Sequence, residues 1–298
     1  MNDADRPRDS DAVAASDTEA AEPLKDAGFV EFAADDWGAH PGLRRTVATS
    51  GGDGSRIFRY EEPRALLKLL SNLQRALGAE SAASIRCRFG DDERADPEWV
   101  ALDRRFGTVA GHCVADYILQ RHFTMHLQPI VKPDGEPIGY EALLRPLPEQ
   151  TPFRPAELFR TARRIGQHAF LDREARHAAI RFGAAHLPAG MKRFVNFLPS
   201  SLHCPEQCLR GTFDAMRESG TDPRDVVFEV VETEPLDNPA MLQVFETYRR
   251  EGALLALDDV GEGCATPEAV DRLRPDYVKM DRQWVSGCHR SDRKRRYI

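Results

Sequence analysis

An α/β fold built around parallel strands is predicted for most of the 298-residue sequence, and three observations support it. From about residue 122 to residue 298, short apolar runs alternate with longer stretches that carry apolar residues every three or four positions. Polar residues interrupt these runs or follow them directly. A hydrophobic content of 41% is enough to bury a sizeable core.

Each apolar run is a candidate strand, and each longer stretch is a candidate helix. The predicted strands cover residues 125–129, 139–144, 193–197, 226–231, 254–257 and 277–280. The predicted helices cover residues 155–165, 170–185, 208–218, 240–251 and 267–273. Six strands alternating with helices fit a (β/α) barrel, in which active sites form at the carboxyl ends of the strands.

The residues before this region are predicted to form a separate small α+β segment, residues 27–121, after an acidic tail. Residues 1–26 lack aromatic residues and β-branched runs and are predicted to be disordered. Residues 56–60 and 83–89 alternate as strands do, and Pro63 opens a predicted helix that extends to Leu77. A longer helix is predicted from about Pro97 to Tyr117, because apolar residues recur there at helical spacing.

Composition excludes several classes of function. A net charge of −7 argues against general nucleic-acid binding, and no nucleic-acid-binding motif is present. The acidic amino terminus has no apolar core, so it is neither a signal peptide nor a membrane span, and no later run reaches the ~18 apolar residues of a transmembrane helix. The six cysteines lack the spacing of a common zinc site or disulfide scaffold. A cytoplasmic protein without membrane or nucleic-acid partners is expected.

Acidic and amide residues stand in the predicted strands or directly after them, where apolar residues are expected. They are Glu141, Asn196, Glu229, Asp258 and Asp259. A buried carboxylate is costly unless it is paired or bound to a metal, and two adjacent carboxylates repel each other unless a cation relieves them. Oxygen ligands of this kind select hard ions such as Mg²⁺ or Mn²⁺. The alternatives are a solvent-exposed Glu141, a hydrogen-bonded core amide at Asn196 and a solvated acidic turn at the aspartate pair.

Two basic residues accompany this set. Lys279 lies within a predicted strand, so either its stem follows apolar surface toward water or its ammonium group acts in the site. Arg145 follows another strand and presents a planar donor fork suited to a phosphate, although a lone arginine at such a place usually faces solvent. Together the acidic, amide and basic residues indicate a site for metal and phosphate.

Five short segments carry these residues in a fixed order along the chain. They are Tyr140-Glu141-Ala142-Leu143-Leu144-Arg145, Val195-Asn196-Phe197, Glu229-Val230-Val231-Glu232, Asp258-Asp259-Val260-Gly261 and Val278-Lys279-Met280-Asp281. This series resembles the EAL family of bacterial cyclic-di-GMP phosphodiesterases over about residues 123–298. The resemblance implies a TIM-like (β/α) barrel and the two-metal hydrolysis of cyclic-di-GMP to linear pGpG.

The resemblance also implies a role for each residue of the site. Glu141, Asn196, Glu229 and Asp258 would bind one Mg²⁺ or Mn²⁺ ion, and Asp258 would share a second ion with Asp259. Lys279 would position or deprotonate the attacking water, and Glu232 would tether the loop after the aspartate pair. Arg145, Leu144 and Asp281 would contact cyclic-di-GMP, and the family pattern is compatible with a homodimer.

Two departures from the family pattern keep other functions open. After the aspartate pair the family usually continues Phe-Gly-Thr-Gly and then Tyr-Ser-Ser, whereas this sequence reads Val260-Gly261-Glu262-Gly263-Cys264-Ala265-Thr266. The motifs of the seventh and eighth barrel strands are also missing, so we expect about six of eight strands and a barrel that is incomplete at its carboxyl end. Both departures predict that hydrolysis of cyclic-di-GMP is impaired in this chain. The alternatives to an active phosphodiesterase are an inactive EAL module that acts as a cyclic-di-GMP receptor or protein-interaction regulator, and a non-functional remnant.

Overall fold

The computed structural model describes residues 23–37, 43, 47, 49–50, 55–91, 98–109, 111–201, 205–231, 239–260 and 267–298. The chain divides into two compact units. The first comprises Met1–Phe123 and Pro146–Leu171, and the second comprises Thr124–Arg145 and Asp172–Ile298. The segment Pro146–Leu171 thus groups with the amino-terminal part of the chain, and the domain limits at residues 26 and 121 stay predictions.

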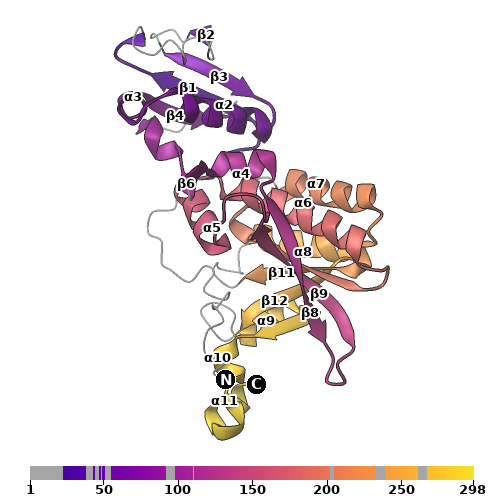
Figure 1. Cartoon of the computed structure of the whole chain (residues 1–298). Helices are drawn as coiled ribbons and strands as arrows, with labels where there is room; N and C mark the ends of the chain where they lie inside the picture. Colours follow the sequence, from indigo (N-terminus) through magenta and orange to yellow (C-terminus); the bar gives the residue numbers. More distant parts are fainter. Residues whose placement is uncertain are drawn as a thin grey trace. The chain divides into compact units, whose positions relative to one another are not determined.

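The first unit contains an antiparallel sheet with the strand order β2-β3-β1-β4-β5 (Figure 1). The strands are β1 (Gly28–Ala33), β2 (Thr49–Ser50), β3 (Arg56–Tyr60), β4 (Arg86–Gly90) and β5 (Val100–Ala101). Pro63 begins the helix α2 (Pro63–Ala76) close to the predicted limits, and the leucines of one face are buried. The strand predicted at residues 83–89 begins later, at Arg86, because the helix α3 (Ala79–Ser84) takes up its first residues.

The long helix predicted from about Pro97 to Tyr117 is wrong. The structure has β5, the 3₁₀ helix η2 (Leu102–Arg105), the antiparallel pair β6 (Thr108–Val109) and β7 (His112–Cys113), and the helix α4 (Val114–Gln120). Two glycines interrupt a continuous helix. Gly111 has a φ of 86°, and a Cβ atom on Gly107 would lie 2.7 Å from Ile165 Cδ1. The apolar spacing therefore reflects several short buried elements rather than one helix face.

The second unit contains a six-stranded sheet with the order β13-β12-β11-β10-β9-β8. The strands are β8 (Phe123–Val131), β9 (Pro137–Pro146), β10 (Lys192–Phe197), β11 (Val226–Val231), β12 (Leu254–Val260) and β13 (Tyr277–Met280). From β9 to β13 each neighbouring pair is parallel. β8 and β9 are joined by a short turn in which Lys132 N donates to Glu136 O, so this pair is an antiparallel hairpin and departs from the all-parallel expectation.

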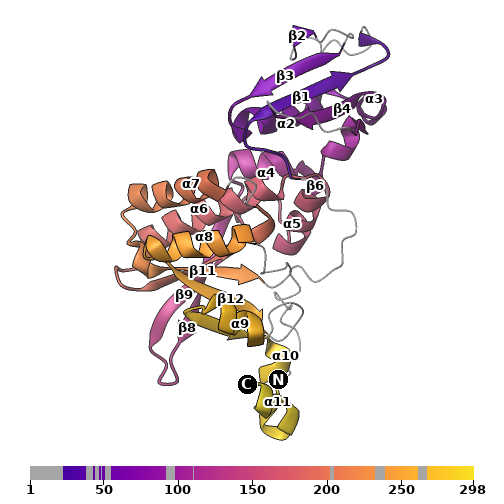
Figure 2. The same cartoon turned by 180° about the vertical axis from the view of Figure 1, so that it is seen from behind.

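Helices connect the parallel strands, as the sequence predicts. They are α5 (Pro155–Arg164), α6 (His168–His186), α7 (Pro205–Ser219), α8 (Pro239–Arg250) and α9 (Pro267–Leu273). After β13 come α10 (Arg282–Val285), η5 (Cys288–Arg290) and α11 (Asp292–Tyr297). The helices α6, α7 and α8 lie together along the sheet in both views (Figures 1 and 2). The predicted α/β fold of (β/α) type, with six strands in the described residues, is confirmed.

In the sheet of the second unit, apolar side chains from neighbouring strands form a row on one face. Phe194, Val227 and Ala256 are buried together, and the rings of Phe194 and Tyr277 meet edge to face at 5.1 Å. Side chains two positions apart on a strand share a face. The residues two positions after these four are all polar: Asn196, Glu229, Asp258 and Lys279. These polar residues therefore lie on the same face of the sheet as the apolar row, two residues closer to the carboxyl ends of the strands.

None of the helices in the part of the chain that the structure describes is both long enough and apolar enough to cross a membrane.

Candidate functional site

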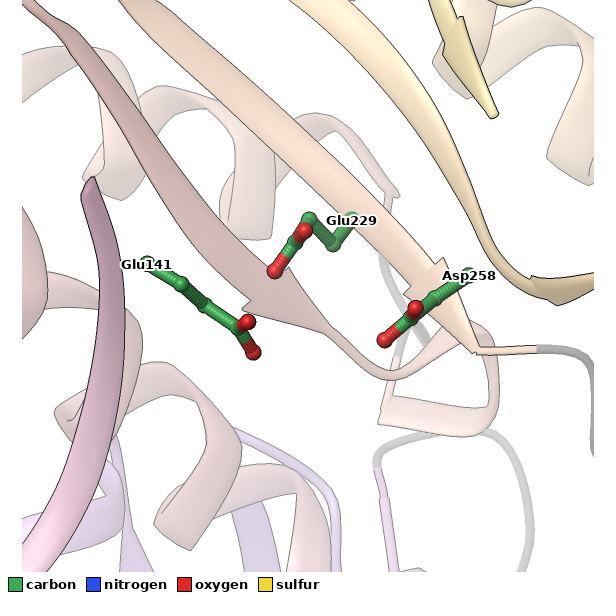
Figure 3. A group of neighbouring side chains, drawn as sticks. All are labelled: Glu141, Glu229 and Asp258. Carbon is green, nitrogen blue, oxygen red and sulfur yellow. The ribbon is translucent and has the colours of Figure 1, made fainter. Parts of the chain in front are cut away.

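Three carboxylates from three strands converge on one point of the sheet. Glu141 of β9, Glu229 of β11 and Asp258 of β12 each offer an oxygen atom within 4.8 Å of the others. Figure 3 shows the three side chains directed toward one another. The strand register explains this arrangement, because Asn196 of β10 pairs with Glu229 on one side while Phe194 pairs with Glu141 on the other. Residues separated by more than a hundred positions in the sequence thus form one acidic cluster.

Lys279 of β13 supplies the positive charge within this cluster. Its Nζ atom lies 2.9 Å from Glu141 Oε2, 2.9 Å from Glu229 Oε1 and 3.2 Å from Asp258 Oδ1. Burial alone would lower the pKa of Lys279, but the three carboxylates outweigh burial and raise the pKa. The ammonium group is therefore firmly protonated. The Lys279 head group thus lies among the carboxylates, and its role in the reaction stays a prediction.

Glu229 is the most buried member of the cluster. Its side chain has no exposed surface, and neither carboxylate oxygen has the geometry of an accepted hydrogen bond with any described residue. Burial and the neighbouring Glu141 raise the pKa of Glu229, although Lys279 acts against them. Burial likewise raises the pKa of Asp258. Both shifts mean that a further positive charge would be needed to stabilise the fully ionised cluster.

The aspartate pair lies where the regular strand pairing breaks. The register between β12 and β13 shifts between Leu257 and Val260, which places Asp258 and Asp259 in an irregular turn of the strand. Asp259 adopts a φ of 53°, and its backbone N–H donates to Asp258 Oδ1 at 3.0 Å. This hydrogen bond fixes the Asp258 carboxylate toward the cluster. A left-handed backbone at a non-glycine residue is uncommon and often marks a functional site.

Asn196 joins the cluster through one hydrogen bond. Its Nδ2 atom donates to Glu141 Oε1 at 3.3 Å. An amide that donates through its nitrogen keeps its oxygen as an acceptor or metal ligand. Asn196 is therefore part of the polar site and is not an isolated core amide.

The remaining predicted residues lie outside the cluster or outside the described residues. Leu144 is buried, and Arg145 Nη1 donates to the Leu144 carbonyl oxygen at 2.8 Å. Asp281 caps α10, because its Oδ1 atom accepts from Gln283 N at 2.6 Å. Glu232 and residues 261–266, which include the departures Glu262 and Cys264, lie outside the described residues. The departure Val260 is described, and it is the buried last residue of β12. The roles of these residues stay predictions.

The sequence analysis missed one residue beside the site, Asp172 of α6. Its carboxylate accepts a hydrogen bond from Leu198 N at 3.2 Å, directly after β10. The residue stands among other charged positions near the start of a helix, a pattern that usually indicates a solvated face. Only 3% of its surface is exposed, because it pairs with the buried Arg176 and contacts the segment after β10.

The cluster fits a divalent cation by its charge and by its donor atoms. Three carboxylates and one ammonium group leave a formal excess of two negative charges in a mostly buried place. The carboxylate oxygens of Glu141, Glu229 and Asp258 and the amide oxygen of Asn196 are hard ligands of the kind that Mg²⁺ and Mn²⁺ prefer.

A parallel (β/α) sheet with a cluster of carboxylates toward the carboxyl ends of its strands is typical of (β/α) barrel proteins, and comparison with known families identifies the class further. The family model "EAL domain" matches residues 114–298. This match covers more than half of the chain, and the chain belongs to the EAL domain family. The resemblance inferred from the five sequence segments is thereby confirmed.

Similar proteins are known from several bacteria. An "Uncharacterized signaling protein" of Caulobacter vibrioides is 27% identical over 180 residues, which is 59% of this chain and 22% of that protein. The "Probable cyclic di-GMP phosphodiesterase PdeG" of Escherichia coli is 33% identical over 108 residues, which is 34% of this chain and 20% of that protein. The chain thus spans about a fifth of the length of these two relatives.

Among solved structures, BlrP1 of Klebsiella pneumoniae in a calcium and cyclic-di-GMP complex is similar in fold and sequence. It has a TM-score of 0.53 and 28% identity, and the similarity covers 59% of this chain and 44% of that chain. BlrP1 has also been solved with manganese and cyclic-di-GMP.

Proposed function

We propose that this chain carries a cyclic-di-GMP phosphodiesterase site, which opens one phosphodiester bond of cyclic-di-GMP to give linear pGpG. The observation that carries the proposal is the convergence of Glu141, Glu229 and Asp258 around Lys279 at one end of a parallel sheet. Membership of the EAL family supports it, as do the name of PdeG and the ligand bound to BlrP1.

Five residues would hold two divalent ions, Mg²⁺ or Mn²⁺. They are Glu141, Asn196, Glu229, Asp258 and Asp259. The calcium and manganese complexes of BlrP1 support a divalent metal in this family. Ions bound here would supply Lewis acidity toward a phosphate oxygen and toward water. The fold would hold the carboxylates of separate strands in position and shield the metal site from most of the solvent.

The side chains around the carboxylates would orient the substrate. The Lys279 ammonium group has three donors, and the three carboxylates occupy them in this structure. Cations bound to these carboxylates would release a donor of Lys279 for a water molecule or a phosphate oxygen. Arg145 would bind a phosphate with its planar fork, next to Leu144, and Asp281 would contact a guanine edge or ribose. Glu232 would tether the loop that follows Asp259. A cytoplasmic location and a homodimer remain part of this proposal.

Hydrolysis by the purified 298-residue chain tests the proposal directly. With Mg²⁺ or Mn²⁺, cyclic-di-GMP should be converted to pGpG, and a chelator should stop the reaction. Asp258→Asn should reduce turnover by at least about 100-fold, because a neutral amide binds and bridges cations poorly. Asp271→Asn removes an exposed carboxylate of α9 and serves as the control that keeps full activity. Undiminished pGpG release by Asp258→Asn would rule out the metal assignment.

A second candidate function is a cyclic-di-GMP receptor without hydrolysis. One observation favours it: Lys279 already pairs with all three carboxylates, so the chain holds its own cation at the place proposed for a metal. A receptor would bind cyclic-di-GMP in the presence of a chelator, and Asp258→Asn would leave the affinity unchanged. Titration calorimetry and the pGpG measurement together separate the enzyme from the receptor. An enzyme releases pGpG and loses this activity in Asp258→Asn, whereas a receptor releases no pGpG and keeps its affinity in that variant.

A further inference from the structure

The strand β10 is held at each of its ends by a buried arginine–aspartate pair. At its amino end Arg193 Nη1 lies 3.3 Å from Asp225 Oδ2, and both side chains are at least nine-tenths buried. At its carboxyl end Arg176 Nη1 donates to Asp172 Oδ2 at 2.5 Å, with 1% and 4% of the two side chains exposed. Only the second pair lies beside Asn196, the residue that β10 contributes to the acidic cluster.

The Asp172 carboxylate organises the chain segment that follows β10. It accepts hydrogen bonds from Leu198 N at 3.2 Å and from Ser201 Oγ at 2.7 Å. Ser201 N in turn donates to Leu198 O at 3.0 Å, which closes the 3₁₀ turn η3 (Pro199–Ser201). These contacts fix the backbone two residues beyond Asn196.

Arg176 holds the residue between Asn196 and this turn. Its guanidinium carbon lies 5.2 Å from the centre of the Phe197 ring, and its Nε atom donates to Thr212 Oγ1 of α7 at 3.1 Å. Phe197 is fully buried, and its ring also meets the ring of Tyr248 of α8 edge to face at 5.7 Å. Arg176 therefore connects α6 and α7 to the end of β10, and Phe197 packs this end against α8. The Phe197 ring cannot turn without breaking these contacts.

We propose that Asp172 and Arg176 are positioning residues of the site: they fix the segment from Phe197 to Ser201 and so set the direction of the Asn196 amide toward Glu141 and toward the metal. The proposal rests on the function proposed above. The Asn196 Nδ2 to Glu141 Oε1 distance is 3.3 Å, close to the limit for a hydrogen bond, so a small rotation of Asn196 would break it. Partners that orient a metal ligand commonly change metal affinity when they are removed.

Two variants of different severity test the proposal in the full chain. Asp172→Asn removes the charge that pairs with Arg176, and Ser201→Ala removes only one hydrogen-bond donor to Asp172. We expect Asp172→Asn to weaken Mn²⁺ binding by about 10- to 100-fold. Ser201→Ala should weaken it in the same direction by about threefold. Electron paramagnetic resonance of Mn²⁺ gives both dissociation constants without any need for activity.

Asp225→Asn is the matched control, because it breaks the equivalent buried pair at the other end of the same strand. It should lower the melting temperature as Asp172→Asn does, since each change leaves a buried arginine without its partner. It should leave the Mn²⁺ dissociation constant unchanged. Equal loss of Mn²⁺ affinity in both variants would reduce the role of Asp172 to general stability and overturn the proposal.

A second measurement reports on Asn196 without metal. The chain has only four asparagines, Asn2, Asn72, Asn196 and Asn238, so selective ¹⁵N-asparagine labelling gives four side-chain amide signals. The Asn196→Asp variant identifies the side-chain signal of Asn196, because that signal is missing from its spectrum. In the metal-free chain this signal should move in Asp172→Asn and in Ser201→Ala and stay in place in Asp225→Asn.

The two measurements separate the positioning role from the proposed function. An Asn196 signal that is unchanged in Asp172→Asn and Ser201→Ala overturns the positioning role, whatever the metal data show. A wild-type chain that binds no Mn²⁺, but whose Asn196 signal moves in these two variants, supports the positioning role and removes the metal site instead.

Discussion

The acidic cluster concentrates charge where a protein interior tolerates it least. Glu229 has no exposed side-chain surface, and a single lysine pairs with three carboxylates, which leaves two formal negative charges without a counter-charge within the cluster. Removing an ion from water costs several kcal/mol, so the fold holds these residues at the expense of stability. A local departure from apolar burial of this kind is expected at functional sites.

A residue-scale prediction concerns Cys113, which caps α4 by accepting a hydrogen bond from Asp116 N. Burial raises the pKa of the Cys113 thiol from 9.0 to about 11. Because the thiolate is the reactive form, folded Cys113 should be alkylated by iodoacetamide about 100-fold more slowly at pH 8 than in urea. The rate should rise about tenfold per pH unit up to pH 11. Peptide mass spectrometry measures it, with the more exposed Cys288 as the folded-state reference. Equal rates with and without urea would contradict the burial of this thiol.

At the scale of elements, close strand contacts bring the site residues together. β9 approaches β10 at Gly139, which pairs with Lys192 and lies two residues before Glu141. A Cβ atom on Gly139 would lie 2.7 Å from the Lys192 carbonyl oxygen and 2.9 Å from Phe194 Cε2. The backbone atom cannot move aside as a flexible side chain could. Glycine at this position thus lets Glu141 lie beside β10.

We therefore expect Gly139→Ala to destabilise the chain by about 1–3 kcal/mol, through overpacking between two parallel strands. Urea denaturation followed by circular dichroism measures the change. Gly78→Ala is the control, since nothing lies within 4 Å of a Cβ at Gly78 and its φ is −70°. A Gly139→Ala variant as stable as Gly78→Ala would show that β9 and β10 are less closely packed than described.

At the scale of the whole molecule, the site joins parts of the sequence that are far apart. The ion pair between Lys279 and Glu141 connects residues 138 positions apart, across all five parallel strands. A ligand that binds all these strands stabilises only the state in which they are assembled. Binding of the proposed metal would therefore be coupled to folding of the second unit.

Mn²⁺ should raise the melting temperature of the chain. At 100 times its dissociation constant the stabilisation is about 2.7 kcal/mol, which corresponds to about 5–10 °C for a unit of this size. Glu229→Gln should abolish most of the shift, because it removes the most buried ligand. Differential scanning fluorimetry at constant ionic strength, with K⁺ as the control, measures this. A shift of equal size in Glu229→Gln would place Mn²⁺ elsewhere on the protein.

The pattern of the sequence predicts the six strands and five helices of the sheet region to within a few residues. Strands buried in a parallel sheet are apolar runs of limited length, and the helices between them keep a regular apolar face, so both signals are local. The first unit was less predictable. The spacing from Trp99 to Tyr117 resembles a helix, yet Gly107 and Gly111 divide it, and β1 carries no strong alternation of its own.

The sequence alone determined the chemistry of this protein: the residue types, their order and their places at strand ends, which together indicate the EAL family and a metal and phosphate site. The tertiary structure alone decided which of these residues meet. Strand register brings Glu141, Glu229 and Asp258 within 4.8 Å, directs Lys279 among them, and leaves Asp281 as a helix cap. It also buries Asp172 and Arg176 against the segment that follows Asn196. The reason is physical: burial and pairing depend on contacts between distant segments, and a side chain carries no local sign of the partner it will meet.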